Sequence, residues 1–166
     1  MNELLDKLSS VLEREVHCYH KLIASARAEQ QALILGKLQE LKLAIEAQEL
    51  LITGTKELET TRREIRHALA QQLGLPSEGL TLTRLIELGY DDETGRIASL
   101  RDTIRDVTDQ LHWLNAGNAQ LLNSSIDFIN QTMWVLLQPR TGKPTYSPNG
   151  NIEARAPGEA LVDHVG

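Results

Sequence analysis

Residues 22–45, LIASARAEQQALILGKLQELKLAI, contain a single glycine between two runs of amphipathic sequence. Apolar residues recur at steps of three and four on both sides of Gly36, which is the spacing of one face of an α-helix. Glycine disfavours helix interiors and suits the residue that follows a helix, so the first helix is predicted to end at Gly36. Two long helices joined this closely are predicted to fold back as an antiparallel hairpin.

The same periodicity extends in both directions and predicts helices over residues 2–35 and 37–73. The apolar stripe expected to face the core consists of Leu5, Leu8, Leu12, Tyr19, Ile23, Ala26 and Leu33 in the first helix, and of Leu38, Leu41, Ile45, Ile52, Leu58, Ile65 and Leu69 in the second. After the loop GLPSEG (74–79), residues 81–89 predict a short helix that Thr81 or Thr83 caps and Gly89 ends. A third long helix is predicted over about residues 93–138, and its first half repeats apolar residues as a coiled coil does, at Ile97, Leu100, Ile104, Val107, Leu111 and Leu114.

The composition supports an all-α fold. Only six of the 166 residues are aromatic, and helix-forming residues take their place, whereas a sandwich or barrel needs short alternating runs of β-branched and aromatic residues. From Pro139 onward the periodicity ends, and this segment holds four of the five prolines. We therefore expect a helical domain at 1–138, a coiled-coil-like bundle of the hairpin with the third long helix, and a flexible, disordered tail at 139–166.

Charge and motif content exclude several classes of function. The net charge is −6 and no basic stripe is present, so nucleic acid is not an expected partner. No apolar run reaches the ~18–20 residues that span a bilayer, so no direct membrane insertion is expected, and cytoplasmic localisation is the prediction. Because the chain has no glycine-rich phosphate loop and no nucleophile elbow, it is not expected to be an enzyme or to need a cofactor.

The one candidate metal site is VHCYH, with His17, Cys18 and His20, and Glu13 one helical turn before His17. Zinc sites use three or four ligands, and no second cluster of the required spacing is present. The pattern favours two surface histidines beside a half-buried thiol, so no metal is expected.

Residues 110–139, QLHWLNAGNAQLLNSSIDFINQTMWVLLQP, carry one formal charge, Asp127, in thirty residues. Two interpretations stay open at this point: a central helix buried against the hairpin and a second copy, or an adhesive helix face for a partner. Aromatics and methionine with few charges are typical of protein interfaces, and this segment holds Trp113, Phe128, Met133 and Trp134. Uncharged polar residues that could supply hydrogen bonds lie between them: Asn115, Asn118, Gln120, Asn123, Ser124, Ser125, Asn130 and Gln131. In the proline-rich tail, Tyr146 is an aromatic residue without a core to fill, and two interpretations stay open: a short docking element or a solvated residue.

The order of these features resembles the FlgN-type flagellar export chaperones. The matching segments are EQQALILGKLQEL (29–41), KELETTRREI (56–65) and LNAGNAQLLNSSIDFINQTM (114–133), followed by an aromatic residue, three residues and a glycine at 146–150. The resemblance implies a cytoplasmic chaperone that binds the C-terminal helices of the hook-associated, or hook–filament junction, proteins and keeps them from premature assembly. It also implies delivery of these clients to the type III export gate.

The same resemblance implies which residues do the work. It places client binding at Leu121, Leu122, Ile126, Phe128, Ile129, Met133 and Trp134. It assigns to Tyr146 docking on the cytoplasmic domain of the export-gate membrane protein. The alternative is a structural coiled-coil scaffold that self-associates through the uncharged helix. Under either interpretation the chain could form a homodimer.

Overall fold

A computed structural model describes residues 1–90 and 95–137 of the chain, and these residues are almost entirely helical. The elements are α1 (Asn2–Leu35), α2 (Leu38–Leu73), the 3₁₀ turn η1 (Ser77–Gly79), α3 (Leu82–Glu87) and α4 (Arg96–Leu137). No strand occurs in these residues, so the all-α prediction of three long helices and one short helix is confirmed. The predicted tail at 139–166 lies outside the described residues.

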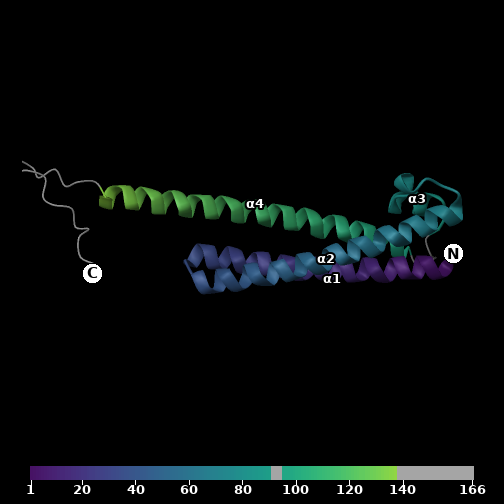
Figure 1. Ribbon diagram of the computed structural model, residues 1–166, viewed down its shortest axis with the longest axis horizontal. Coiled ribbons are helices and arrows are strands. Elements are labelled where there is room, and N and C mark those ends of the chain that lie inside the picture. The colour runs from purple at the N-terminus through teal and green to yellow at the C-terminus, as the bar shows by residue number, and fades with distance from the viewer. Residues whose placement is uncertain (91–94, 138–166) are drawn as a thin grey trace, which may run out of the picture. The chain divides into compact units, whose positions relative to one another are not determined.

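The hairpin forms at the predicted glycine. Gly36 follows α1 with φ 64° and ψ 28°, in the left-handed region that glycine adopts without steric cost. The N–H of Lys37 donates to the carbonyl of Ala32 at 2.9 Å, which closes the end of the helix. In Figure 1 α1 and α2 run side by side in opposite directions from this turn. Near the turn, small buried alanine side chains lie between the two helices. The Ser25 hydroxyl donates a hydrogen bond across the pair to the Ala44 carbonyl at 2.9 Å.

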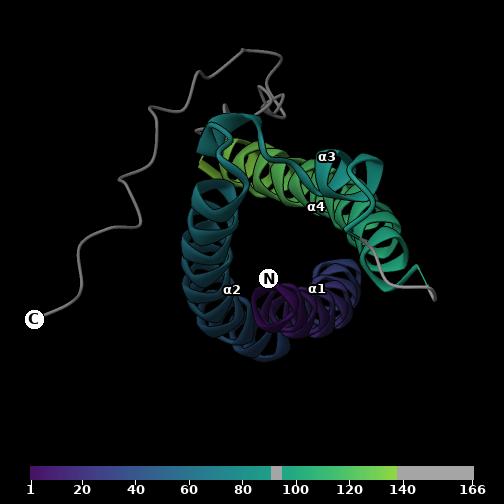
Figure 2. The same cartoon turned by 90° about the vertical axis from the view of Figure 1, so that its right-hand side faces the viewer.

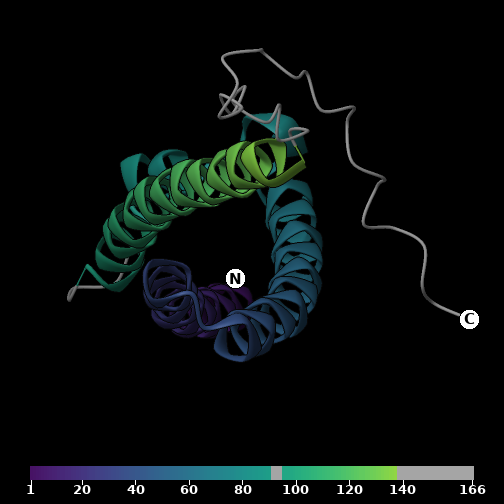
Figure 3. The same ribbon diagram turned by 90° about the vertical axis from the view of Figure 1, so that its left-hand side faces the viewer.

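The helices separate toward the open end of the hairpin, and there the 74–90 segment contributes to the core. Figures 2 and 3 view the hairpin from its two ends and show α2 moving away from α1 toward α3. Leu80 and Leu85 are almost completely buried in one cluster with Leu8, Leu12 and Leu69. The hydroxyl of Thr81 accepts a hydrogen bond from the N–H of Arg84 at 3.1 Å, so Thr81 rather than Thr83 is the cap of α3.

A buried ion pair crosses the hairpin inside this region. The Glu15 side chain is only 2% exposed, and Nε of Arg62 donates to its Oε1 at 2.9 Å. Burial raises the pKa of the Glu15 carboxyl above its ordinary value, and the Arg62 charge opposes that rise. The tertiary pairing therefore joins α1 to α2 across 47 positions of sequence, which no local pattern indicates.

The chain divides into two compact units, Met1–Ser125 and Ile126–Gly166. Within the first unit, α4 packs on α1 through the predicted coiled-coil stripe: Val107 and Leu114 form a buried cluster with Ile23 and Ala26. At one end of this contact Arg96 pairs with Glu13 at 2.7 Å, and at the other Asn118 bonds to Ala26, so the two helices run parallel here.

Asn118 is the last buried residue of α4. Its Nδ2 donates to the Ala26 carbonyl at 2.8 Å and to Oε2 of Glu29 at 3.0 Å, and the same Glu29 oxygen accepts from Nε2 of Gln48 at 2.8 Å. This polar node joins all three long helices. A buried polar residue in an apolar seam fixes the register of the helices. Asn118 is therefore internal and is not one of the partner-facing polar residues that the sequence suggested.

In the first half of α2, the buried residues are not the ones that the apolar periodicity predicted. Leu38, Ile45 and Ile52 were expected to face the core, but they are 77%, 42% and 43% exposed. Ala44 is buried in their place, with Leu41 and Gln48 half-buried beside it. The reason is that small side chains at the α1–α2 contact let the helices approach closely, which leaves the larger aliphatic residues on the flank of α2.

Candidate functional site

The candidate site is the C-terminal part of α4, from Ile126 to Leu137. These residues are the helical part of the second unit. Eight of these twelve residues are apolar and every one of the eight is at least 46% exposed: Ile126, Phe128, Ile129, Met133, Trp134, Val135, Leu136 and Leu137. Asp127 supplies the only charge. A helix with so many exposed apolar residues is typical of one that a partner covers.

Helical spacing divides these side chains between two sides. One side carries apolar residues at steps of three, four and three: Ile126, Ile129, Met133 and Leu136. Phe128 and Val135, seven positions apart, lie on the other side, and a shallow hollow there is lined by Phe128, Gln131, Thr132, Val135 and Leu136. Trp134 lies between the two sides and is 66% exposed. The segment can therefore make apolar contacts around most of its circumference.

The hydroxyl groups of this region are bound to their own helix. The hydroxyls of Ser124, Ser125 and Thr132 each donate to the carbonyl four residues earlier, at 2.8 to 2.9 Å. Their protons are therefore not available to a partner, and the hydroxyl oxygens remain as acceptors. Of the uncharged polar residues predicted to serve an interface, Asn and Gln side chains are the ones left as donors.

The predicted client-binding residues divide between the two units. Leu121 is half-buried and Leu122 is exposed, and both belong to the first unit. The other five, Ile126, Phe128, Ile129, Met133 and Trp134, lie in the second unit and are all exposed. Val135, Leu136 and Leu137 are also exposed here but were not among the predicted residues. The seven-residue steps from Phe128 to Val135 and from Ile129 to Leu136 were the signals for the first two. Tyr146 lies outside the described residues.

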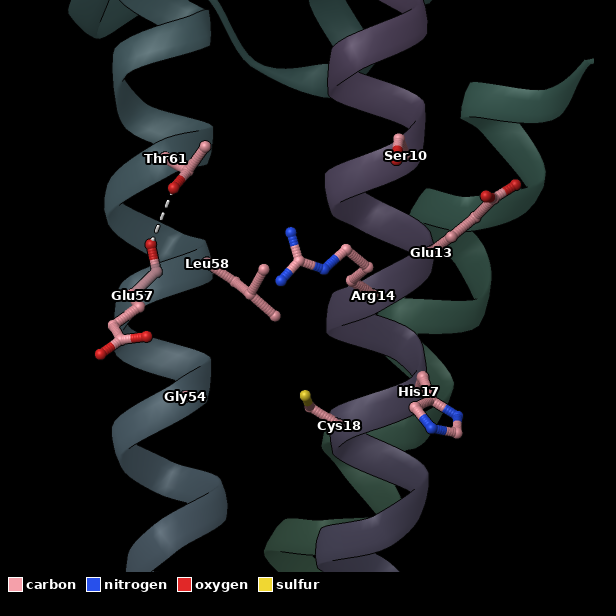
Figure 4. A pocket seen from close by; sticks show the side chains of 9 residues that line it. All are labelled: Ser10, Glu13, Arg14, His17, Cys18, Gly54, Glu57, Leu58 and Thr61. Atoms are coloured by element: carbon pink, nitrogen blue, oxygen red, sulfur yellow. Dashed lines mark hydrogen bonds between the residues drawn. The ribbon is translucent and has the colours of Figure 1, made fainter.

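The VHCYH segment lies on α1 beside an open hollow of about 490 Å³ between α1 and α2. Figure 4 shows the Cys18 sulfur pointing toward the gap and the His17 ring pointing away from it on the other side of α1. Glu13 is occupied by its ion pair with Arg96. Within residues 1–90 and 95–137, no three His, Cys, Asp or Glu side chains gather as metal ligands would. His17 and His20 are exposed and Cys18 is half-buried, as the surface interpretation predicted.

The end of α4 therefore offers apolar helical contact. None of the helices in the described part of the chain has the length and hydropathy to cross a membrane.

The sequence model of a protein family described as "FlgN protein" matches residues 1–154. The chain belongs to the FlgN family. The match confirms the resemblance noted from the order of the helical segments and runs through the exposed end of α4 and position 146. FlgN proteins are a family of flagellar export chaperones, not a family of enzymes, so membership assigns this chain to flagellum assembly and protein export. No curated protein and no solved structure gives a match to the chain.

Proposed function

We propose that this FlgN-family chain binds the C-terminal helices of hook-associated proteins through the exposed apolar end of α4. By covering these helices it prevents their premature assembly, and it then delivers the client to the export gate in the cytoplasm. Tyr146 serves as the docking residue for the gate's cytoplasmic domain.

The observation that carries the proposal is the exposed helix from Ile126 to Leu137, with eight apolar residues and one charge. A client helix that assembles through an apolar stripe needs an equivalent helical surface to cover that stripe. The side formed by Ile126, Ile129, Met133 and Leu136 has the required three-four spacing. Met133 adds a flexible, polarizable side chain that can adapt to more than one client.

Placing a charge on this side is expected to weaken client binding. Met133→Glu puts a carboxylate into an apolar contact, and an unpartnered buried charge of this kind costs on the order of 3 kcal/mol, or roughly 100-fold in affinity. Because Met133 is 52% exposed in the free protein, the fold should not change. Titration of a purified hook-associated protein by calorimetry measures the affinity, and circular dichroism monitors the helices.

Ala116→Glu is the matched control, because it adds the same charge to an exposed residue of the same helix, ten positions before Ile126 and outside the candidate site. We expect it to retain client affinity within about threefold. If Met133→Glu leaves the affinity unchanged, the apolar side does not hold the client. If Met133→Glu unfolds the protein, Met133 belongs to a core, and the interpretation of a buried central helix is the correct one.

Replacing Tyr146 is expected to separate client binding from delivery. Tyr146→Ala should weaken capture of the chaperone–client complex by the gate's cytoplasmic domain by roughly 2 kcal/mol, the loss typical of an aromatic anchor. Client affinity should stay the same, because the proposal places the client on α4. Tyr146→Phe keeps the ring and tests whether the hydroxyl contributes. Unchanged gate affinity for Tyr146→Ala would remove this residue from the mechanism.

The self-associating scaffold remains the second candidate, since the side with Phe128 and Val135 is also exposed. A scaffold would bind its own copies through this helix and would not need a client. Light scattering during the titration distinguishes the two: a chaperone forms a complex with the client, whereas a scaffold keeps its own oligomeric mass and leaves the client free.

A further inference from the structure

A small hollow lies at the open end of the hairpin, where α2 meets the 74–90 segment. Its volume is about 160 Å³, and its apolar floor lies beside positive charge. Four of its seven lining residues are leucines, and three of these leucines are at most 2% exposed. The lining residues, which define what we call the arginine hollow, are Leu8, Arg62, Arg66, Leu80, Thr81, Leu82 and Leu85.

Arg66 is the cation of this hollow that the fold leaves without a counter-charge. Arg62 pairs with the buried Glu15 at 2.9 Å, and Arg63, the next arginine of α2, has Glu59 at 4.0 Å. Arg66 forms no ion pair with residues 1–90 and 95–137, and its Nε is buried without a hydrogen-bond partner. Buried donors in folded proteins are nearly always satisfied, so this one indicates an acceptor that the fold itself does not supply.

The charges beside the arginine hollow sum to an excess of one positive charge. Three guanidinium groups gather there against two carboxylates, although the chain as a whole has a net charge of −6. The 74–90 segment adds no carboxylate to the lining, because Glu87 pairs with Arg84 at 3.1 Å and Glu78 is exposed outside the hollow. The groups counted are Arg62, Arg63, Arg66, Glu15 and Glu59.

The lining favours a carboxylate that is attached to an apolar stem. Arg62 and Arg66 lie one helical turn apart, so both can donate to one carboxylate. The Thr81 hydroxyl accepts from the N–H of Arg84, which leaves its own proton to donate. The leucines would desolvate a phosphate without compensation, whereas they suit the methylene groups of an acidic side chain. A hollow of this volume takes side chains rather than a whole helix, which is about 10 Å across.

We propose that the arginine hollow binds an acidic side chain, together with an apolar neighbour, from a peptide segment of a partner protein. The carboxylate neutralises Arg66, and the apolar neighbour covers the leucines. The hollow belongs to the first unit, whereas the proposed client site belongs to the second, so this inference does not depend on the proposed function. It gives the hairpin a binding role of its own, in which charge selects the partner.

Binding of the peptide acetyl-Leu-Glu-Leu-amide to the full chain tests the proposal. Proton–nitrogen NMR follows the Nε–H signals of the arginines and the backbone amides of residues 80–85. We expect these signals to shift with a dissociation constant on the order of 1 mM, which one ion pair and a small apolar contact can provide. The matched peptide acetyl-Leu-Gln-Leu-amide has nearly the same shape without the charge, and it should bind at least about tenfold more weakly.

Arg66→Met is the variant that removes the positive charge and keeps an apolar stem in its place. It should weaken binding of the glutamate peptide at least about tenfold, because the unpaired cation is lost. Arg63→Met is the matched control, since it makes the same change on the same helix at an exposed residue that does not line the arginine hollow. It should retain the affinity within about threefold, and circular dichroism checks that both variants fold.

Three results would overturn the inference. Equal binding of the two peptides would show that the hollow does not recognise a carboxylate. Equal losses in Arg66→Met and Arg63→Met would indicate long-range attraction without a site. Inorganic phosphate that binds the same residues more tightly than the glutamate peptide would assign the hollow to phosphate groups instead. If Arg66→Met does not fold, Arg66→Lys replaces it: lysine keeps the charge but loses the planar pair of donors, and an affinity reduced at least about threefold is expected. Unchanged affinity in Arg66→Lys would likewise contradict the proposal.

Discussion

Leu69→Ala is expected to lower the free energy of unfolding by about 3 kcal/mol, the middle of the range for a fully buried leucine. Leu69 has no exposed surface and lies in the cluster that joins α1, α2 and the 74–90 segment. Removing three carbon atoms leaves a cavity in the cluster that also holds Leu8 and Leu12 of α1 and Leu85 of α3, and these two elements cannot close together freely. The lost transfer free energy and the cavity therefore add.

Leu38→Ala is the matched control for Leu69→Ala. The substitution is chemically the same, it lies in the same helix, and the apolar periodicity of the sequence places both residues in one stripe. Because Leu38 is 77% exposed, we expect its loss to change stability by no more than about 0.5 kcal/mol. Urea denaturation followed by circular dichroism measures both variants. Equal losses would contradict the observed packing and would show that Leu38 is covered in solution.

Arg62→Ala is expected to destabilise the protein by about 3 kcal/mol near pH 8, because it leaves Glu15 buried without its counter-charge. Arg62 is about one-third exposed, whereas Glu15 is almost fully buried, so the carboxylate is the partner that loses solvation. Glu59 also faces this group and raises the pKa of Glu15. Arg63→Ala is the control: its side chain is exposed, and its nearest carboxylate, Glu59, is 4.0 Å away.

The loss in Arg62→Ala should depend on pH. The pKa of Glu15 is raised in the folded protein, so the folded state holds more protons than the unfolded state between the two pKa values. Within this window the Glu15 contribution to stability falls as pH rises, and the penalty is complete above the folded pKa. Without Arg62 the folded pKa rises further, which extends the window upward.

Lowering the pH from 8 to 5 should therefore recover part of the stability that Arg62→Ala loses, because Glu15 becomes protonated. Thermal unfolding of the parent, Arg62→Ala and Glu15→Gln at both values measures the effect. Glu15→Gln cannot titrate at position 15, so its stability should vary less with pH than that of the parent. A loss in Arg62→Ala that is the same at pH 5 and pH 8 would show that the arginine acts through packing alone.

Local sequence was sufficient for the helices and for the turn between the first two. Gly36 ends α1 because glycine adopts the left-handed conformation without steric cost. This effect is local, so it can be predicted from the residues around the turn. The stripe from Ile97 to Leu114 faces the core as predicted, since every third or fourth residue shares a helix face whatever the partner is. The uncharged end of α4 was likewise visible in the sequence, as was the three-four spacing of Ile126, Ile129 and Met133 within it.

Only the tertiary structure decided which face of each helix meets which neighbour. Periodicity gave Leu38, Ile45 and Ile52 the same expected burial as Leu58, Ile65 and Leu69, but the small residues at the α1–α2 contact turned the first three outward. The burial of Leu80 and Leu85, the Glu15–Arg62 pair and the Asn118 node depend on residues that are far apart in sequence. Periodicity fixes the position of a residue around its own helix axis. Burial depends on the distance to a second helix, and the sequence pattern of one helix carries no information about that distance.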